Sequence, residues 1–143
     1  MTRIISTFFG TGYSKYAPGT MGSLASLAIW APCVFLEISP WIRLFLVLVV
    51  FLVGWWATFK ALPSFKSLDP KEVVIDEVAG QGLALVLCPP GWLGLGLGFV
   101  LFRLLDILKP WPISYVDRKI KNALGVMLDD MLAGALVLLI WLC

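Results

Sequence analysis

Two apolar runs in the first half of the chain are each long enough to cross a lipid bilayer. They cover residues 21–38 and 42–59, and each holds a single charged residue near one end, Glu37 or Arg43. A helix needs about 20 apolar residues to span the hydrocarbon core of a membrane. We therefore expect two membrane-spanning helices, joined by a tight turn at Ser39-Pro40.

The composition supports a membrane protein. Hydrophobic residues make up 60% of the 143 residues and charged residues only 14%, whereas soluble domains are about half apolar and about one-quarter charged. A chain of this length forms one domain, which we expect to cover residues 1–143. The net charge of +2 does not suggest nucleic-acid binding. The sequence contains no histidine, which excludes histidine bases and histidine metal ligands.

The three cysteines lie in or beside apolar runs and show no paired spacing. We expect them to be small apolar side chains rather than disulfide partners or zinc ligands. They are Cys33, Cys88 and Cys143.

A third apolar region, residues 78–105, contains a strong turn signal. Residues 88–91 read Cys-Pro-Pro-Gly, and proline disfavours a helical conformation in the residue before it. Two interpretations are open: one kinked span, or a helical hairpin that enters the membrane and returns. The arms of a hairpin would be short for a full crossing, which is tolerated where they are buried in protein. We prefer the hairpin because it brings the polar segments together.

In the hairpin interpretation the last span covers residues 131–143, with an extension back to residue 125. The N-terminus and segments 60–77 and 106–130 then share one side of the membrane. With Arg103, near the end of the second arm, that side holds ten of the eleven Lys and Arg residues, and it holds eight of the nine acids. Basic residues accumulate in cytoplasmic loops, so this side is expected to be cytoplasmic. The expected fold is an all-α polytopic membrane helix bundle with a Pro-Pro hairpin at residues 78–105 and interfacial loops.

Two acidic doublets, Asp76-Glu77 and Asp129-Asp130, lie where we expect a polar loop to enter an apolar helix. Acids at a helix N-terminus can cap free N–H groups and favour the helix dipole, which explains one acid per helix better than two. Several carboxylates at one interface repel one another unless a cation neutralises them. Oxygen ligands without histidine or paired cysteine favour Mg²⁺ or Mn²⁺ over zinc. We predict a metal site, with helix capping as the alternative.

A second group of charges lies in residues 102–112 (FRLLDILKPWP). Arg103, Asp106 and Lys109 recur at intervals of three, so they lie broadly along one side of a helix. A charge within an apolar arm needs a partner or a cavity. One interpretation is a structural Arg103–Asp106 ion pair. The other is that the two cations bind a phosphate while Asp106 joins the carboxylate site.

Glycines mark two further places. Residues 10–23 (GTGYSKYAPGTMGS) are rich in glycine and hydroxyl groups and directly precede the first span, where backbone N–H groups can face an anion. Thr20 and Ser23 are our phosphate-binding candidates there, and an ordinary interfacial loop is the alternative.

Gly80 and Gly134 each follow an acid by four residues. They leave space one turn below a carboxylate or, equally well, allow close helix packing.

Taken together, these residues resemble the phosphatidylglycerophosphatase A family. The resemblance covers nearly the whole chain and rests on four ordered segments: residues 17–23 (APGTMGS), 74–80 (VIDEVAG), 102–113 (FRLLDILKPWPI) and 127–134 (MLDDMLAG). It implies a Mg²⁺-dependent lipid phosphatase of the bacterial inner membrane. Such an enzyme hydrolyses phosphatidylglycerophosphate to phosphatidylglycerol and phosphate at the cytoplasmic face. The partners implied are a membrane phospholipid substrate and the bilayer, and the oligomeric state is left open.

The roles we expect follow from this chemistry. Metal lowers the pKa of a water and polarises phosphoryl oxygens, while Arg103 and Lys109 offset charge on the transferring phosphoryl group. The metal ligands and catalytic acids are expected to be Asp76, Glu77, Asp129 and Asp130, with Asp106 as a further catalytic candidate.

Other function classes fit the sequence less well. A cation transporter, or a transporter subunit with an acidic interfacial cation site, needs acids near the membrane centre, whereas these acids cluster at one interface. A lipid alcohol phosphotransferase needs a longer acidic motif with an alanine-arginine step, which is absent. A purely structural subunit would leave the four ordered segments unexplained.

Overall fold

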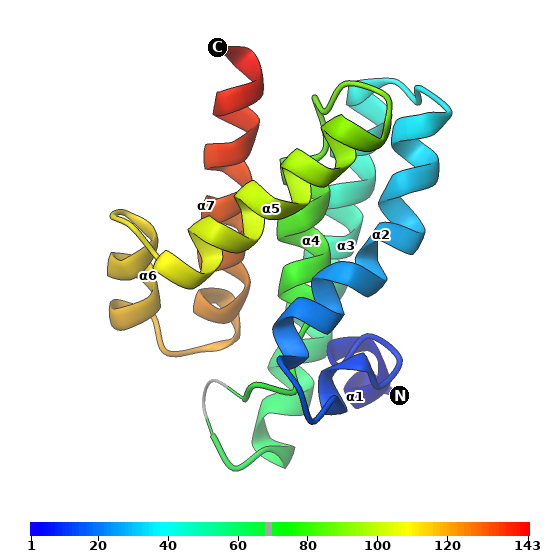
Figure 1. Cartoon of the computed structure of the whole chain (residues 1–143). Coiled ribbons are helices and arrows are strands. Elements are labelled where there is room, and N and C mark those ends of the chain that lie inside the picture. Colours follow the sequence, from blue (N-terminus) through cyan, green and yellow to red (C-terminus); the bar gives the residue numbers. More distant parts are fainter. Residues whose placement is uncertain (68–69) are drawn as a thin grey trace.

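The computed structural model describes residues 1–67 and 70–143, and this described part is helical with no strand. The all-α prediction is therefore confirmed. Figure 1 shows the helices as a bundle, with short elements at one end. In chain order the elements are α1 (Thr2–Ser6), η1 (Thr11–Tyr13), α2 (Pro18–Phe35), α3 (Pro40–Ala61), η2 (Leu62–Ser64), α4 (Ile75–Ala84), α5 (Trp92–Leu108), α6 (Ile113–Lys119) and α7 (Ala123–Leu142).

Three helices, α2, α3 and α7, are long and apolar enough to cross a membrane. The first two match the predicted spans but begin a few residues earlier, at Pro18 and Pro40. Proline suits this position because the first helical N–H groups have no partner within the helix. Large apolar side chains of α3, among them Phe45, Leu48 and Leu52, are exposed on the surface of the bundle. The chain is a membrane protein.

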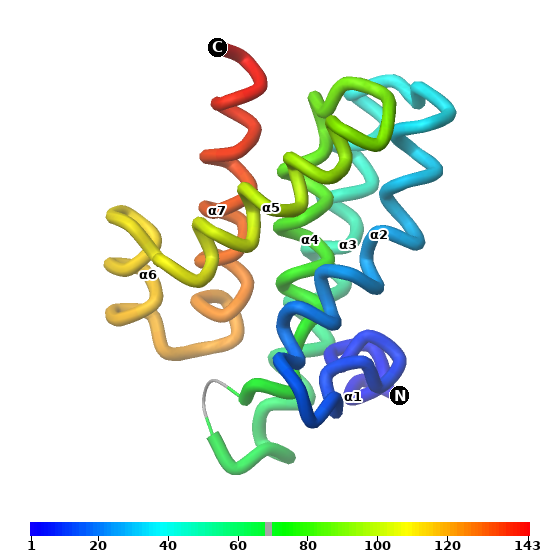
Figure 2. The backbone as a smooth tube through the Cα atoms, in the orientation of Figure 1, coloured from blue at the N-terminus to red at the C-terminus, as the bar shows by residue number. Residues whose placement is uncertain are grey.

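The region around Pro89-Pro90 forms the predicted hairpin. Helix α4 runs beside α3, the chain reverses after Ala84, and α5 returns across α4 and α7 (Figure 1, Figure 2). The reversal lies at the same end of the molecule as the connection between α2 and α3. The polar loops and α6 lie towards the opposite end (Figure 1), as the hairpin interpretation requires.

Arg43 holds the reversal in place. Its side chain is buried, and Nη1 donates to the carbonyl oxygens of Leu85 (3.3 Å), Val86 (3.2 Å) and Cys88 (3.4 Å). Carbonyls at a helix C-terminus have no partner within the helix and need donors from elsewhere. The single cation that interrupts the second apolar run therefore serves the turn of the hairpin.

Helix α4 is the centre of the bundle. Every residue from Ile75 to Ala84 is buried, and two tryptophans of neighbouring helices bind its backbone. Trp30 Nε1 donates to the Val78 carbonyl at 2.9 Å, and Trp141 Nε1 donates to the Ala84 carbonyl at 2.8 Å. Because protein surrounds it on all sides, this short arm does not need to match the thickness of a bilayer.

Two glycines let α4 and α7 touch. A Cβ atom on Gly80 would lie 2.6 Å from the backbone oxygen of Asp130, and one on Gly134 would collide with the backbone oxygen of Gly80. The close-packing explanation of these glycines is therefore confirmed. The crossing sets the start of α4 beside residues 129–130 of α7, which positions the site.

Candidate active site

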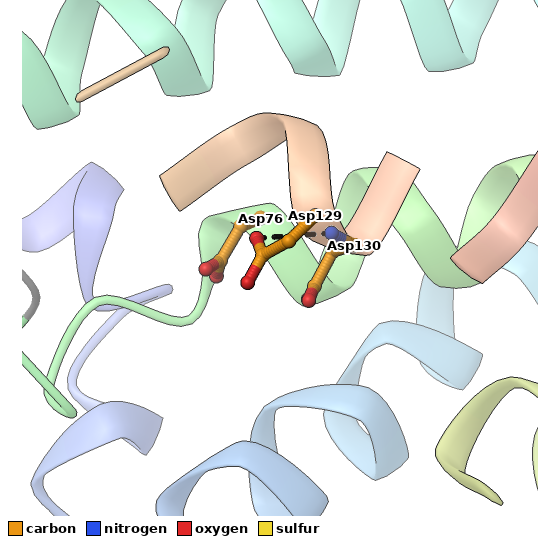
Figure 3. Close-up of side chains that lie close together, drawn as sticks. All are labelled: Asp76, Asp129 and Asp130. Carbon is orange, nitrogen blue, oxygen red and sulfur yellow. Dashed lines mark hydrogen bonds between the residues drawn. The ribbon is translucent and has the colours of Figure 1, made fainter. Parts of the chain in front are cut away.

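Three aspartates from two helices form a cluster at the α4–α7 crossing. Asp76 comes from the first turn of α4, and Asp129 and Asp130 come from α7. One carboxylate oxygen of each lies within 4.8 Å of the others, and all three residues are buried. Figure 3 shows the three side chains projecting from the two helices into one shared space.

The two doublets share a local geometry. Asp76 Oδ1 accepts the backbone N–H of Glu77 at 2.9 Å, and Asp129 Oδ1 accepts the backbone N–H of Asp130 at 3.0 Å. In each doublet the first carboxylate is thus held by the next residue's backbone. This bond fixes the side chain and leaves its second oxygen for other partners. The two acidic doublets therefore share one local geometry, although they lie on different helices.

Helix capping does not explain the second doublet. We expected Asp129-Asp130 where a loop enters the last helix, but that expectation was wrong: α7 begins at Ala123, so the doublet lies in its second turn. The cap is Asn122, whose side-chain oxygen accepts the N–H groups of Leu124 and Gly125 at 3.0 Å. Two buried acids inside an apolar helix need another reason to be there.

Arg103 of α5 joins a second group of side chains beside the cluster. Its Nη1 lies 2.8 Å from Glu77 Oε2 and 2.6 Å from Asp106 Oδ2. The hydroxyls of Ser23 and Thr20, both on α2, accept from Arg103 at 3.4 and 3.3 Å. Ser23 also donates to Glu77 Oε2. The structural ion pair that the spacing suggested is present, and it includes Glu77 as well as Asp106.

The glycines of segment 17–23 bring α2 close to α4. A Cβ atom on Gly19 would collide with Glu77 Oε1, and one on Gly22 would lie 2.7 Å from Val74 Cβ. Small residues here let the carboxylate approach the helix backbone. Most of this segment forms the first turns of α2 and is not a loop. Thr20 and Ser23 therefore lie about one helical turn apart, and both side chains contact Arg103.

Lys109 lies at the end of α5 and bridges two helices. Its backbone is left-handed, with φ 44° and ψ 57°, a conformation that costs about 1–2 kcal/mol for a residue with a side chain. Nζ lies 2.8 Å from Asp117 Oδ1 on α6 and 2.8 Å from Asp129 Oδ2 on α7. Burial opposes its charge, but the hydrogen bonds to the two carboxylates outweigh burial and raise the pKa of Lys109. The same hydrogen bond lowers the pKa of Asp117.

The structure thus groups the predicted site residues differently from the sequence analysis. Of four predicted metal ligands it brings together Asp76, Asp129 and Asp130, while Glu77 turns to Arg103. Of four phosphate-binding candidates it brings together Arg103, Thr20 and Ser23, while Lys109 contacts Asp129. Asp117 was not anticipated, because a single acid beside Arg118 and Lys119 has the pattern of a solvated loop.

The charge balance of the site fits a divalent cation. Arg103 pairs with Glu77 and Asp106, and Lys109 pairs with Asp117 and Asp129. Within residues 1–67 and 70–143, Asp76 and Asp130 have no basic partner, and the buried Oδ2 of Asp130 has no hydrogen-bond partner. A buried set of oxygen ligands in which two of three carboxylates lack a basic partner is suited to a divalent cation. The acidic cluster could therefore bind a metal ion.

Comparison with known proteins gives consistent matches. The Phosphatidylglycerophosphatase A family model matches residues 4–143. Phosphatidylglycerophosphatase A of Escherichia coli (strain K12) is 36% identical over 135 residues, which are 93% of this chain and 77% of that protein. Phosphatidylglycerophosphatase A of Haemophilus influenzae is 36% identical over 134 residues, covering 92% of this chain and 80% of that protein.

A third relative carries a different name. A putative phosphatidylinositol-3-phosphatase of Bacteroides thetaiotaomicron is 38% identical over 138 residues, which are 92% of this chain and 85% of that protein. No solved structure gives a significant match. The family match extends over almost the entire chain and includes every side chain of the site described above. This membrane protein is an enzyme that belongs to the phosphatidylglycerophosphatase A family.

Proposed function

We propose that this protein is a Mg²⁺-dependent lipid phosphatase that hydrolyses phosphatidylglycerophosphate to phosphatidylglycerol and phosphate in phospholipid biosynthesis. The observation that carries the proposal is the buried cluster of Asp76, Asp129 and Asp130 next to the Arg103 group. A carboxylate cluster and a guanidinium side by side suit a phosphate ester and a divalent cation. Family membership supports the reaction class.

Asp76, Asp129 and Asp130 would hold the metal ion. A bound Mg²⁺ would polarise the phosphoryl oxygens and offset the negative charge of the phosphate and the carboxylates. Among the described residues, Oδ2 of Asp130, which is buried and has no hydrogen-bond partner, is the clearest candidate for a metal-binding atom. Glu77 belongs to our catalytic set through Arg103, whose guanidinium it orients, rather than as a direct ligand.

Arg103 would bind the phosphoryl group together with Thr20 and Ser23. A planar guanidinium binds phosphate oxygens in a defined orientation, and Glu77 and Asp106 hold that plane. In the reaction a water oxygen attacks phosphorus, and the bond between phosphorus and the glycerol oxygen breaks. One carboxylate accepts a proton from the water and passes it to the departing glycerol oxygen, which leaves as an alcohol.

We place the protein in the bacterial inner membrane with this site facing the cytoplasm. The headgroup phosphate of a phospholipid lies at the membrane interface, and Asp76 lies in the first turn of α4, which begins at the end of the bundle that carries the polar loops (Figure 1). Basic residues accumulate at that end, as is typical of cytoplasmic segments. They include Arg3, Lys15, Lys60, Lys66, Lys71, Arg118, Lys119 and Lys121.

The test is phosphate release from phosphatidylglycerophosphate by the purified protein in detergent micelles. We expect chelation to abolish activity and added Mg²⁺ to restore it. Asp130→Asn and Asp129→Asn should each lower kcat by about 100-fold or more, the loss typical of removing one preorganised electrostatic contact. Glu72→Gln, a loop carboxylate outside the cluster, is the matched control and should keep its activity.

Two outcomes would contradict the proposal. Full activity after chelation would refute the metal requirement. Faster phosphate release from phosphatidylinositol 3-phosphate than from phosphatidylglycerophosphate would assign the substrate named for the Bacteroides relative instead.

A further inference from the structure

Lys109 is shared between the acidic cluster and a carboxylate outside it. Its Nζ is 2.8 Å from Asp129 Oδ2, which belongs to the cluster, and 2.8 Å from Asp117 Oδ1, which belongs to α6. Only one of these two carboxylates is a candidate metal ligand. An ammonium group that binds a ligand carboxylate occupies an oxygen that a metal ion needs, so the two cations compete for Asp129.

Helix α6 is held firmly enough to present Asp117 at a fixed place. Ile113, its first residue, is fully buried and packs in a cluster with Phe102, Ala133 and Val137. Asp117 follows Ile113 by four residues, so both lie on the same side of α6. That side faces α7, whereas Arg118 and Lys119 are exposed. Asp117 therefore belongs to the docked face of the helix.

Repulsion between Lys109 and a bound metal ion explains why Asp117 lies beside Lys109. A divalent cation bound at Asp76, Asp129 and Asp130 repels the Lys109 ammonium. Asp117 offers that ammonium a second, equally close carboxylate, so Lys109 can release Asp129 and still remain beside the site. The contact with Asp117 keeps the Lys109 charge near a bound phosphate and leaves all three aspartates free to bind the metal ion.

We propose that Asp117 is a positioning residue that draws Lys109 away from Asp129 and thereby sets the affinity of the acidic cluster for its divalent cation. This inference rests on the proposed function, because it assumes that the cluster binds a metal ion. It adds a residue on α6 to the site and assigns Lys109 a second role, as the cation that competes with the metal.

Metal binding itself provides the test. The full chain in phosphatidylcholine nanodiscs is freed of metal and titrated with Mn²⁺, and bound Mn²⁺ is followed by the loss of the free-ion electron paramagnetic resonance signal. Asp117→Asn should weaken Mn²⁺ binding about three- to tenfold, the size expected when a charge-assisted hydrogen bond is redirected to Asp129. Lys109→Met should tighten Mn²⁺ binding. Asp117→Glu, which keeps the carboxylate, should bind Mn²⁺ with near wild-type affinity.

A double-mutant cycle separates this mechanism from simple charge loss. In the Lys109→Met background, Asp117→Asn should change Mn²⁺ affinity by less than about twofold, because no ammonium remains to be redirected. Glu72→Gln removes an acid from a polar loop without touching the cluster and should change little. In activity assays Asp117→Asn should raise the Mg²⁺ concentration needed for half-maximal rate while kcat at saturating Mg²⁺ stays near wild type.

The outcomes distinguish the inference from the proposed function. If Asp117→Asn leaves Mn²⁺ affinity unchanged, or weakens it equally with and without Lys109, Asp117 does not act through Lys109 and the inference is overturned while the metal site stands. If the wild-type protein binds no Mn²⁺, the metal site itself fails and the inference fails with it.

Discussion

Arg103 is the residue on which the largest number of polar contacts in the site converge. One guanidinium pairs with two carboxylates, the buried Glu77 and the partly buried Asp106, and reaches two hydroxyls of α2. These contacts alone fit a structural role for Arg103, and the proposed function adds phosphate binding. The two roles can be separated by removing Arg103 together with the charge of Glu77, because a structural role predicts that activity recovers with stability and phosphate binding predicts that it does not.

We predict that Arg103→Gln destabilises the protein by about 3 kcal/mol, because it leaves the buried Glu77 and the partly buried Asp106 without their cation. The double variant Arg103→Gln/Glu77→Gln should recover part of this stability, since the uncompensated charge at position 77 is gone. It should remain inactive, since the phosphoryl group has lost its guanidinium. Chemical unfolding in detergent and phosphate release measure the two effects. A double variant with near wild-type activity would reduce Arg103 to a structural role.

Contacts between residues close in the sequence could be predicted, whereas contacts between residues on different helices could not. The three-residue interval predicted that Arg103 and Asp106 lie together, and they do. The interval could not predict that Glu77 and Ser23 complete the group, because α2, α4 and α5 meet only in the folded bundle. The same holds for Arg43, a lone cation in an apolar run whose acceptors are carbonyls in the turn that follows α4.

At the scale of elements, the crossing of α4 and α7 decides whether the acidic cluster exists. Gly80 and Gly134 allow backbone contact between the two helices, and that contact sets the distance from Asp76 to the second doublet. The sequence predicted the hairpin from Pro89-Pro90 and a last span at residues 131–143 with an extension back to residue 125, and α7 begins at Ala123. The apolar run begins at residue 131, whereas Asn122 begins the helix two turns earlier. Of the two acids between these points, Asp129 pairs with Lys109 at the end of α5.

We predict that Gly80→Ala separates α4 from α7 and lowers activity at least tenfold, with a loss of stability of about 1–3 kcal/mol from overpacking. Its added Cβ would lie 2.6 Å from the backbone oxygen of Asp130, which cannot rotate away. Gly96→Ala on α5 is the matched control, because nothing lies within 4 Å of its added Cβ. Alanine there should stabilise the helix by up to about 1 kcal/mol. Wild-type Mn²⁺ affinity in Gly80→Ala would show that the crossing does not set the cluster.

At the scale of the whole molecule, the arrangement separates a polar end from a nearly uncharged one. The hairpin allows this, because it returns the chain to the polar end before α6 and leaves the far end to two connections and the end of α7 (Figure 2). Of the two charged residues assigned to the far end, Arg43 is buried against carbonyls and Glu37 is exposed. In the proposed function, a headgroup substrate would therefore meet the acids from one side of the membrane only.

Cysteine labelling in cells tests which side that is. In a Cys143→Ser background, Cys33 and Cys88 are buried and should stay unlabelled. We expect a membrane-impermeant maleimide to label Ser39→Cys, between α2 and α3, in intact cells. It should label Lys119→Cys, at the end of α6, only after permeabilisation, because basic residues around α6 favour the cytoplasm. Both positions are exposed in the folded protein, so access depends on the membrane and not on burial. The reverse pattern would place the active site on the periplasmic face, and labelling of both positions in intact cells would contradict the hairpin topology in the membrane.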